Sequence, residues 1–135
     1  MDYADIRGRL LSRPEAQEDF PFAPDIAVMK IKGKMFATLS TGKTLDGQAS
    51  CPHINLKCDP EQALMLRDIF PAVIPGYHMN KRHWNTLVLD GSIPAGEVQR
   101  MLEHSYSLVV KGLTKVQRTA LELSYSAQEL HPQHH

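Results

Sequence analysis

The chain has 135 residues, 22% of them charged and 42% hydrophobic, with a formal net charge of zero and a pI near 7.1. Such a composition is that of one globular domain, and its neutrality gives no general attraction to nucleic acid or membranes. No apolar run approaches the roughly 20 residues of a membrane span. Two cysteines are too few for a disulfide framework, and the first residues lack the pattern of a secretion signal, so we expect a cytoplasmic protein.

The first predicted element is a helix over residues 2–13, which Pro14 ends. Residues 14–24 contain three prolines and predict an irregular connection. We expect Phe20 and Phe22 to anchor that connection to the core.

Two strands are predicted next, over residues 25–32 and 35–40, with a tight turn at Gly33-Lys34. The alternation places Lys30 and Lys32 on one face of the first strand. After a glycine-containing loop, a third strand is predicted over residues 50–57. The side chains of Cys51, His53, Asn55 and Lys57 are expected to point to one face, and those of Ile54 and Leu56 to the other.

The strongest local signal is Asp59-Pro60, where Asp59 can cap a helix and proline suits its first position. This helix is expected to reach Pro71. The chain is then expected to be extended from about Pro75 and to turn near Asn80, before a strand over residues 84–89.

A long helix is predicted from a cap at Ser92 to Lys111, with Gly112 just past its end. Thr114 is expected to cap a short last helix over residues 115–123. Residues 1–123 would then form a single domain, and residues 124–135 a frayed polar tail. The strand connections are mostly too short for parallel crossovers. We therefore predict an α+β two-layer sandwich, with a mostly antiparallel sheet and helices packed on one face.

The centre of the chain is its most distinctive part, and several separated motifs resemble those of the MmcQ/YjbR family. The motifs are Pro75-Gly76-Tyr77-His78-Met79-Asn80-Lys81-Arg82-His83-Trp84-Asn85-Thr86, Leu89-Asp90-Gly91-Ser92, Phe20-Pro21-Phe22, Lys30-Ile31-Lys32-Gly33-Lys34-Met35-Phe36-Ala37, Asn55-Leu56-Lys57-Cys58-Asp59-Pro60-Glu61 and His104-Ser105-Tyr106. The resemblance covers about residues 1–122. It implies a CyaY-like fold and a small cytoplasmic bacterial protein of a family commonly described as DNA-binding, without catalytic residues or a cofactor.

The residues themselves indicate one surface that could contact DNA. Residues 28–57 contain five lysines against one acid, and two further cations follow in the central stretch. Phosphate would be contacted by Lys30, Lys32, Lys57, Lys81 and Arg82. The loop would be shaped, or bases contacted, by Asn80, His83 and Trp84.

The alternative is a protein-interaction module that uses an open sheet face, with Tyr77, Met79 and Trp84 as anchors. A plain solubilising role for the lysines also stays open. Two further interpretations are weaker. Cys51 and His53 could bind a metal with Cys58, His78 or His83, but the spacing matches no zinc motif. Cys58 precedes a helix, yet Asp59 opposes a thiolate there, so we expect no enzyme and no cofactor.

Overall fold

A computed structural model provides the structure of the chain and describes residues 1–42, 51–77 and 79–133. Its elements are α1 (Tyr3–Leu11), β1 (Gln17–Ala23), β2 (Ile26–Ile31), β3 (Lys34–Ser40), β4 (His53–Lys57), α2 (Pro60–Ile69), β5 (Val73–Pro75), β6 (Trp84–Val88), α3 (Ala95–Lys111), α4 (Lys115–Ser124) and α5 (Ala127–Leu130).

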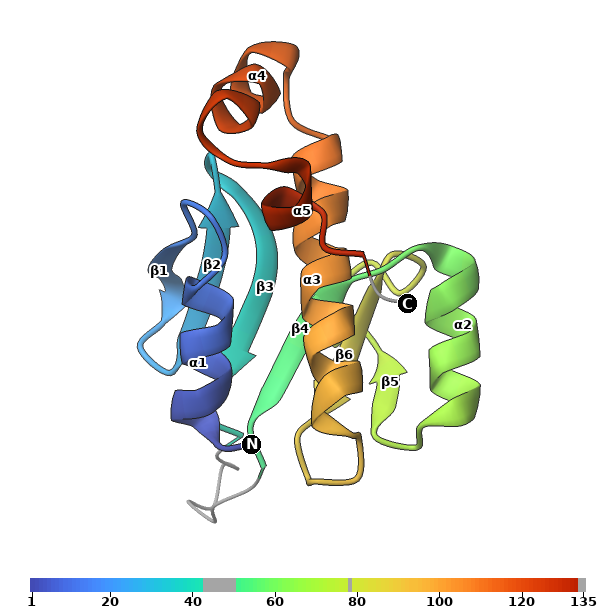
Figure 1. The fold of residues 1–135 in the computed structure, drawn as a ribbon. Helices are drawn as coiled ribbons and strands as arrows, with labels where there is room; N and C mark the ends of the chain where they lie inside the picture. The colour runs from blue at the N-terminus through green and yellow to red at the C-terminus, as the bar shows by residue number, and fades with distance from the viewer. Residues whose placement is uncertain (43–50, 78, 134–135) are drawn as a thin grey trace.

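The strands of the described residues form one sheet in the order β1-β2-β3-β4-β6-β5, and each neighbouring pair is antiparallel. Helices pack on one side of this sheet, with α3 lying across it (Figure 1). The predicted α+β architecture, a mostly antiparallel sheet with helices on one face, is therefore confirmed. Within the described ranges, none of the helices combines the length and apolarity needed to cross a membrane.

The core lies between the sheet and α3, whose apolar stripe faces the strands. Phe36 of β3 meets Tyr106 of α3 edge to face, with ring centroids 5.2 Å apart. Beside this pair, the buried Ser105 hydroxyl accepts from the Lys57 backbone N–H at 2.8 Å and donates to the Phe36 carbonyl at 2.5 Å. One side chain of α3 thus joins two neighbouring strands to the helix layer.

The opposite face of the sheet carries a row of polar side chains. Thr38, Asn55 and Thr86 occupy directly paired positions on β3, β4 and β6. Asn55 donates to Thr38 at 3.0 Å and accepts from the Thr86 hydroxyl, which in turn accepts from the Tyr77 N–H at 2.9 Å. This row ties the centre of the sheet to the turn that follows β5.

The expectation for residues 14–24 is wrong, because much of this segment forms the edge strand β1. β1 pairs with β2, and its register shifts between Asp19 and Ala23. An edge strand tolerates a proline such as Pro21, since its missing N–H is not needed on the open side. Phe20 and Phe22 do not anchor the core: they are 47% and 73% exposed.

The hairpin turn is one residue earlier than expected. Ile31 pairs with Lys34, so the turn is Lys32-Gly33, where both residues have positive φ, 51° and 79°. Two successive positive φ values suit the twist of a two-residue hairpin. Lys32 is consequently a turn residue and does not share a strand face with Lys30.

The N-terminal caps predicted for the helices are confirmed in part. Asp59 caps α2 as predicted, accepting from the N–H groups of Glu61 and Gln62. Ser92 does not cap α3, which starts after Pro94; instead, the Ser92 backbone and hydroxyl both bond the Asp90 carboxylate.

Two further boundaries differ from those predicted, one at β5 and one near the end of the chain. The extended segment β5 ends at Pro75, where it was expected to begin. Residues 127–130, expected to be frayed, form α5, which begins with a capping box at Ser126. Leu130 is buried, and Ser107 of α3 lies 2.6 Å from His131 Nδ1, so this part of the chain packs against α3.

Candidate nucleic-acid interface

Three of the expected phosphate-binding cations lie at one end of the sheet, where β4 ends and β6 begins. Lys57 is the last residue of β4 and pairs directly with Trp84, the first residue of β6. Lys81 and Arg82 occupy the turn just before Trp84, and both are exposed. We call Lys57, Lys81 and Arg82 the basic cluster. Among the residues described, no acid lies within ion-pair distance of any of the three.

The other two cations, both near the β2–β3 hairpin, have acidic partners. Lys30 Nζ lies 3.2 Å from an Asp19 carboxylate oxygen, and Lys32 Nζ lies 3.0 Å from one of Glu15. Surface pairs of this kind contribute only about 0–1 kcal/mol to stability. They nevertheless place a negative charge beside each lysine, so the positive potential is weaker there than at the basic cluster.

The turn of residues 76–83 is shaped by its own polar groups. The Asn80 side chain accepts from the Arg82 N–H at 2.9 Å, and the Asn80 carbonyl accepts from the His83 N–H at 3.2 Å. The His83 carbonyl then accepts from the Cys58 N–H at 2.7 Å. Asn80 and His83 therefore hold Arg82 at a fixed place beside the end of β4.

Trp84 is buried beneath the turn and its ring offers no stacking surface, since only 9% of the residue is exposed. The Gly76 backbone lies close against it: a Cβ at Gly76 would come within 2.8 Å of Trp84 Cβ and 3.1 Å of Met79 Cβ. Tyr77, by contrast, is 67% exposed. Tyr77 is therefore the accessible aromatic residue of this stretch, while Trp84 supports the turn. The remaining histidine of this stretch, His78, lies outside the described residues.

Arg67 of α2 is a structural residue of this site that the sequence analysis missed. Its Nε donates to Asn85 Oδ1 at 2.7 Å, and its Nη2 donates to the carbonyls of Lys81 and Trp84. Asn85 is 1% exposed and also bonds the Ala63 carbonyl of α2 at 3.4 Å. The guanidinium thus ties the helix to the turn that carries Lys81 and Arg82. A basic residue in the last turn of α2 was the only signal in the sequence.

Cys58 and His104, which lie near the start of α2, have structural roles. Burial, and to a lesser extent the neighbouring Asp59 carboxylate, raise the pKa of the Cys58 thiol to about 11. Burial also lowers the pKa of His104, whose Nε2 accepts from the Asp59 N–H at 3.3 Å. In the part of the chain that the structure describes, no three metal-ligating side chains gather in a metal-binding cluster.

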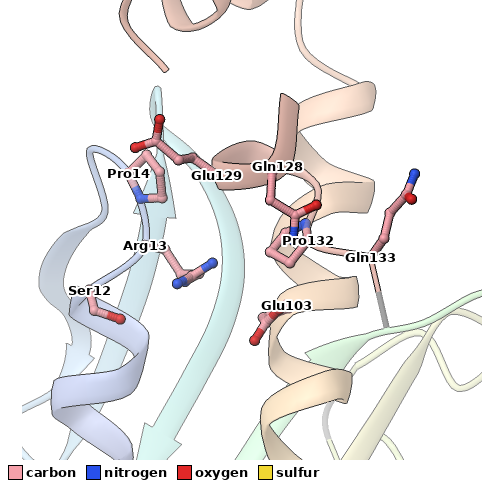
Figure 2. Close-up of a pocket in the computed structure, with 8 residues that line it drawn as sticks. All are labelled: Ser12, Arg13, Pro14, Glu103, Gln128, Glu129, Pro132 and Gln133. Atoms are coloured by element: carbon pink, nitrogen blue, oxygen red, sulfur yellow. The ribbon is translucent and has the colours of Figure 1, made fainter. Parts of the chain in front are cut away.

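Two hollows of the surface lie away from the basic cluster. One, of about 420 Å³, lies where the end of α1 faces α3 and α5; Arg13 and Glu103 point into it from opposite sides (Figure 2). The other, of about 470 Å³, is formed by Phe20, Phe22, Ala23 and Pro24. The candidate interface is an exposed end of the sheet with a fixed turn, and neither hollow is part of it.

An open six-stranded antiparallel sheet with helices on one side defines a class of small α+β domains. The family profile described as YjbR matches residues 11–108. The chain belongs to the YjbR family, as its motifs indicated. It is 37% identical over 105 residues to the uncharacterised protein YbdF of Escherichia coli O157:H7, covering 78% of this chain and 81% of that protein. It is 28% identical over 121 residues to the uncharacterised protein YjbR of Escherichia coli K12, covering 90% of this chain and 98% of that protein.

Solved structures agree with the fold. The crystal structure of Deinococcus radiodurans DR2400, which carries a DUF419 domain, superimposes with a TM-score of 0.79 at 36% identity over 99% of this chain and 96% of that one. The crystal structure of a protein from Pseudomonas syringae matches with a TM-score of 0.68 at 29% identity, covering 80% of this chain and 98% of that one. These similarities establish the family and the fold.

Proposed function

We propose that this protein binds DNA without catalysing a reaction, and that the basic cluster makes the phosphate contacts. The observation that carries the proposal is that Lys57, Lys81 and Arg82 lie at the same end of the sheet, with no acidic ion-pair partner among the described residues. Cations without neighbouring acids bind phosphate by releasing its condensed counterions.

Preorganisation of the turn supports the same function. Arg67 and Asn80 fix the backbone that carries Lys81 and Arg82, so binding need not order that backbone. Three cations form a small electrostatic footprint, and the chain is neutral overall. We therefore expect weak binding that is lost at high salt.

The test is fluorescence anisotropy with a labelled mixed-sequence duplex and a single strand, at low and at physiological salt. The variant Lys57→Ala/Lys81→Ala/Arg82→Ala is expected to lose binding. Its matched control is Lys30→Ala/Lys32→Ala, which removes two lysines that already have acidic partners and is expected to keep most of the affinity. Absence of binding by the wild type at low salt, or equal losses in both variants, would contradict the proposal.

A protein-interaction module remains the second candidate, because Tyr77 and Ile74 are 67% and 40% exposed at the end of β5. Trp84 cannot serve as an anchor in this alternative, since it is buried. Tyr77→Ala separates the candidates. It would leave duplex binding unchanged if phosphate contacts dominate, and would abolish capture of a protein partner if Tyr77 is the anchor.

A further inference from the structure

Helix α4 carries an apolar stripe that faces away from the domain. Val116 and Leu123, two turns apart, are 80% and 84% exposed. Thr119 and Ala120 lie between them on the same side and are also exposed. In Figure 1, α4 projects beyond the end of the sheet. An amphipathic helix normally turns such a stripe towards the core, so its outward position calls for an explanation.

The orientation of α4 is fixed by well-made contacts. Thr114 and Gln117 form a capping box at its start, and Leu121, on the opposite side from the stripe, is completely buried. The domain therefore already uses one face of α4, and Val116 and Leu123 form a second apolar face.

We infer that the exposed stripe of α4 packs, antiparallel, against α4 of a second copy of the chain. Charge complementarity supports this pairing. Lys115 and Glu122 are two turns apart and lie on the same flank of the stripe. In an antiparallel helix pair, equal flanks face each other, so Lys115 lies beside the partner's Glu122, and the same contact recurs at the other end of the pair.

The register fits the side chains as well. A two-fold axis between Thr119 and Ala120 sets Val116 level with the partner's Leu123. It also leaves Lys115 and the partner's Glu122 offset by about 3 Å along the helix. The small Thr119 and Ala120 side chains then lie at the point of closest approach, where they permit close helix packing.

The positions of these charges also run against the needs of an isolated helix. Lys115 is the first residue of α4 and Glu122 lies in its last turn, whereas the helix dipole favours acids at the start and bases at the end. The pairing with a second copy gives both side chains a partner. Because one 10-residue helix forms a small interface, we expect weak, concentration-dependent dimerisation.

Sedimentation velocity of the full chain, from about 10 µM to about 1 mM, tests this inference. The wild type is expected to form dimers as its concentration rises, and Leu123→Asp to raise the dissociation constant at least about tenfold. Lys115→Glu and Glu122→Lys should each weaken dimerisation alone, because each sets like charges against one another. Both changes favour the isolated helix, so neither is expected to unfold α4.

An equimolar mixture of Lys115→Glu and Glu122→Lys gives the sharpest result, since every flank contact then joins opposite charges and a mixed dimer should form. Asp68→Lys, a charge reversal on the exposed side of α2, should dimerise like the wild type. The inference is overturned if the wild type stays monomeric at the highest concentration. It is also overturned if a dimer persists unchanged in Leu123→Asp, or if the mixture stays monomeric.

Discussion

The Nε of Arg67 donates to Oδ1 of Asn85 at 2.7 Å, joining two residues that are 18 positions apart in the chain. Arg67 belongs to α2 and Asn85 to β6, so this contact connects the helix layer to the sheet at its exposed end. Through the same guanidinium, the carbonyl of Lys81 is held as well. The basic cluster therefore depends on a residue that need not touch the ligand.

Replacing Arg67 by alanine should destabilise the protein and loosen the turn. Asn85 would remain buried with one of its partners removed, and we expect a loss of about 2–3 kcal/mol. Urea unfolding measures the loss. Arg67→Lys should recover little of it, because an ammonium cannot reproduce the planar fork of donors. A stability change within about 0.5 kcal/mol for Arg67→Ala would show that this anchor is unimportant.

Gly76→Ala should also destabilise the protein, by about 1–3 kcal/mol, since the added Cβ would lie 2.8 Å from both Cβ and the carbonyl oxygen of Trp84. The matched control is Gly8→Ala in the interior of α1, where the new Cβ would meet nothing within 4 Å apart from its chain neighbours and the backbone of its own helix. That control should stabilise the helix by about 0.5–1 kcal/mol. Thermal unfolding of both variants measures the contrast, and equal midpoints would argue against a close packing of the turn on Trp84.

Ser105→Ala should cost about 2–3 kcal/mol, because it leaves two buried backbone groups, Lys57 N–H and Phe36 C=O, without this hydroxyl. Ser12→Ala is the control: Ser12 is exposed and its hydroxyl donates only to the Arg9 carbonyl. Its effect should stay within about 0.5 kcal/mol. Urea unfolding of the two variants decides whether the Ser105 bridge matters to the joint between α3 and the sheet.

Stability should fall as the pH is lowered from about 7 to about 5, because the pKa of His104 is lower in the folded than in the unfolded chain. Burial is the main cause, and Arg100 adds to it. Below the unfolded pKa, the unfolded chain takes up a proton that the folded chain resists, so acid favours unfolding. His104→Gln should flatten this dependence. Burial lowers the pKa of His131 as well, so His131→Gln should remove a further part of the pH dependence of stability. An unchanged pH profile in His104→Gln would contradict the assignment.

Local signals in the sequence predicted the longer helices and the central strands. Asp59-Pro60 marked the start of α2, and Gly112 marked the end of α3. β1 was missed because Pro21 and its neighbours oppose a strand locally, whereas pairing along one edge of β2 outweighs that preference. α5 was missed because a single turn with one buried residue, Leu130, gives almost no periodic pattern.

The candidate site was predicted less completely, since its geometry depends on contacts between distant segments. Lys57 and Lys81 come together only through the pairing of β4 with β6, which the sequence analysis did not predict. The pairing of Lys30 with Asp19 follows from β1, the strand that was missed. Arg67 had no visible partner in the sequence, because Asn85 lies on another element.

The salt dependence of DNA binding tests the central claim most directly. A plot of log affinity against log salt concentration has a slope of about −0.9 for each phosphate neutralised, so three contacts predict a slope of about −3 for the wild type. The variant Lys57→Ala/Lys81→Ala/Arg82→Ala should lose both the affinity and most of this slope, while Lys30→Ala/Lys32→Ala should keep them. A wild type that does not bind at low salt, or a triple variant with an unchanged slope, would contradict the assignment of the basic cluster to DNA.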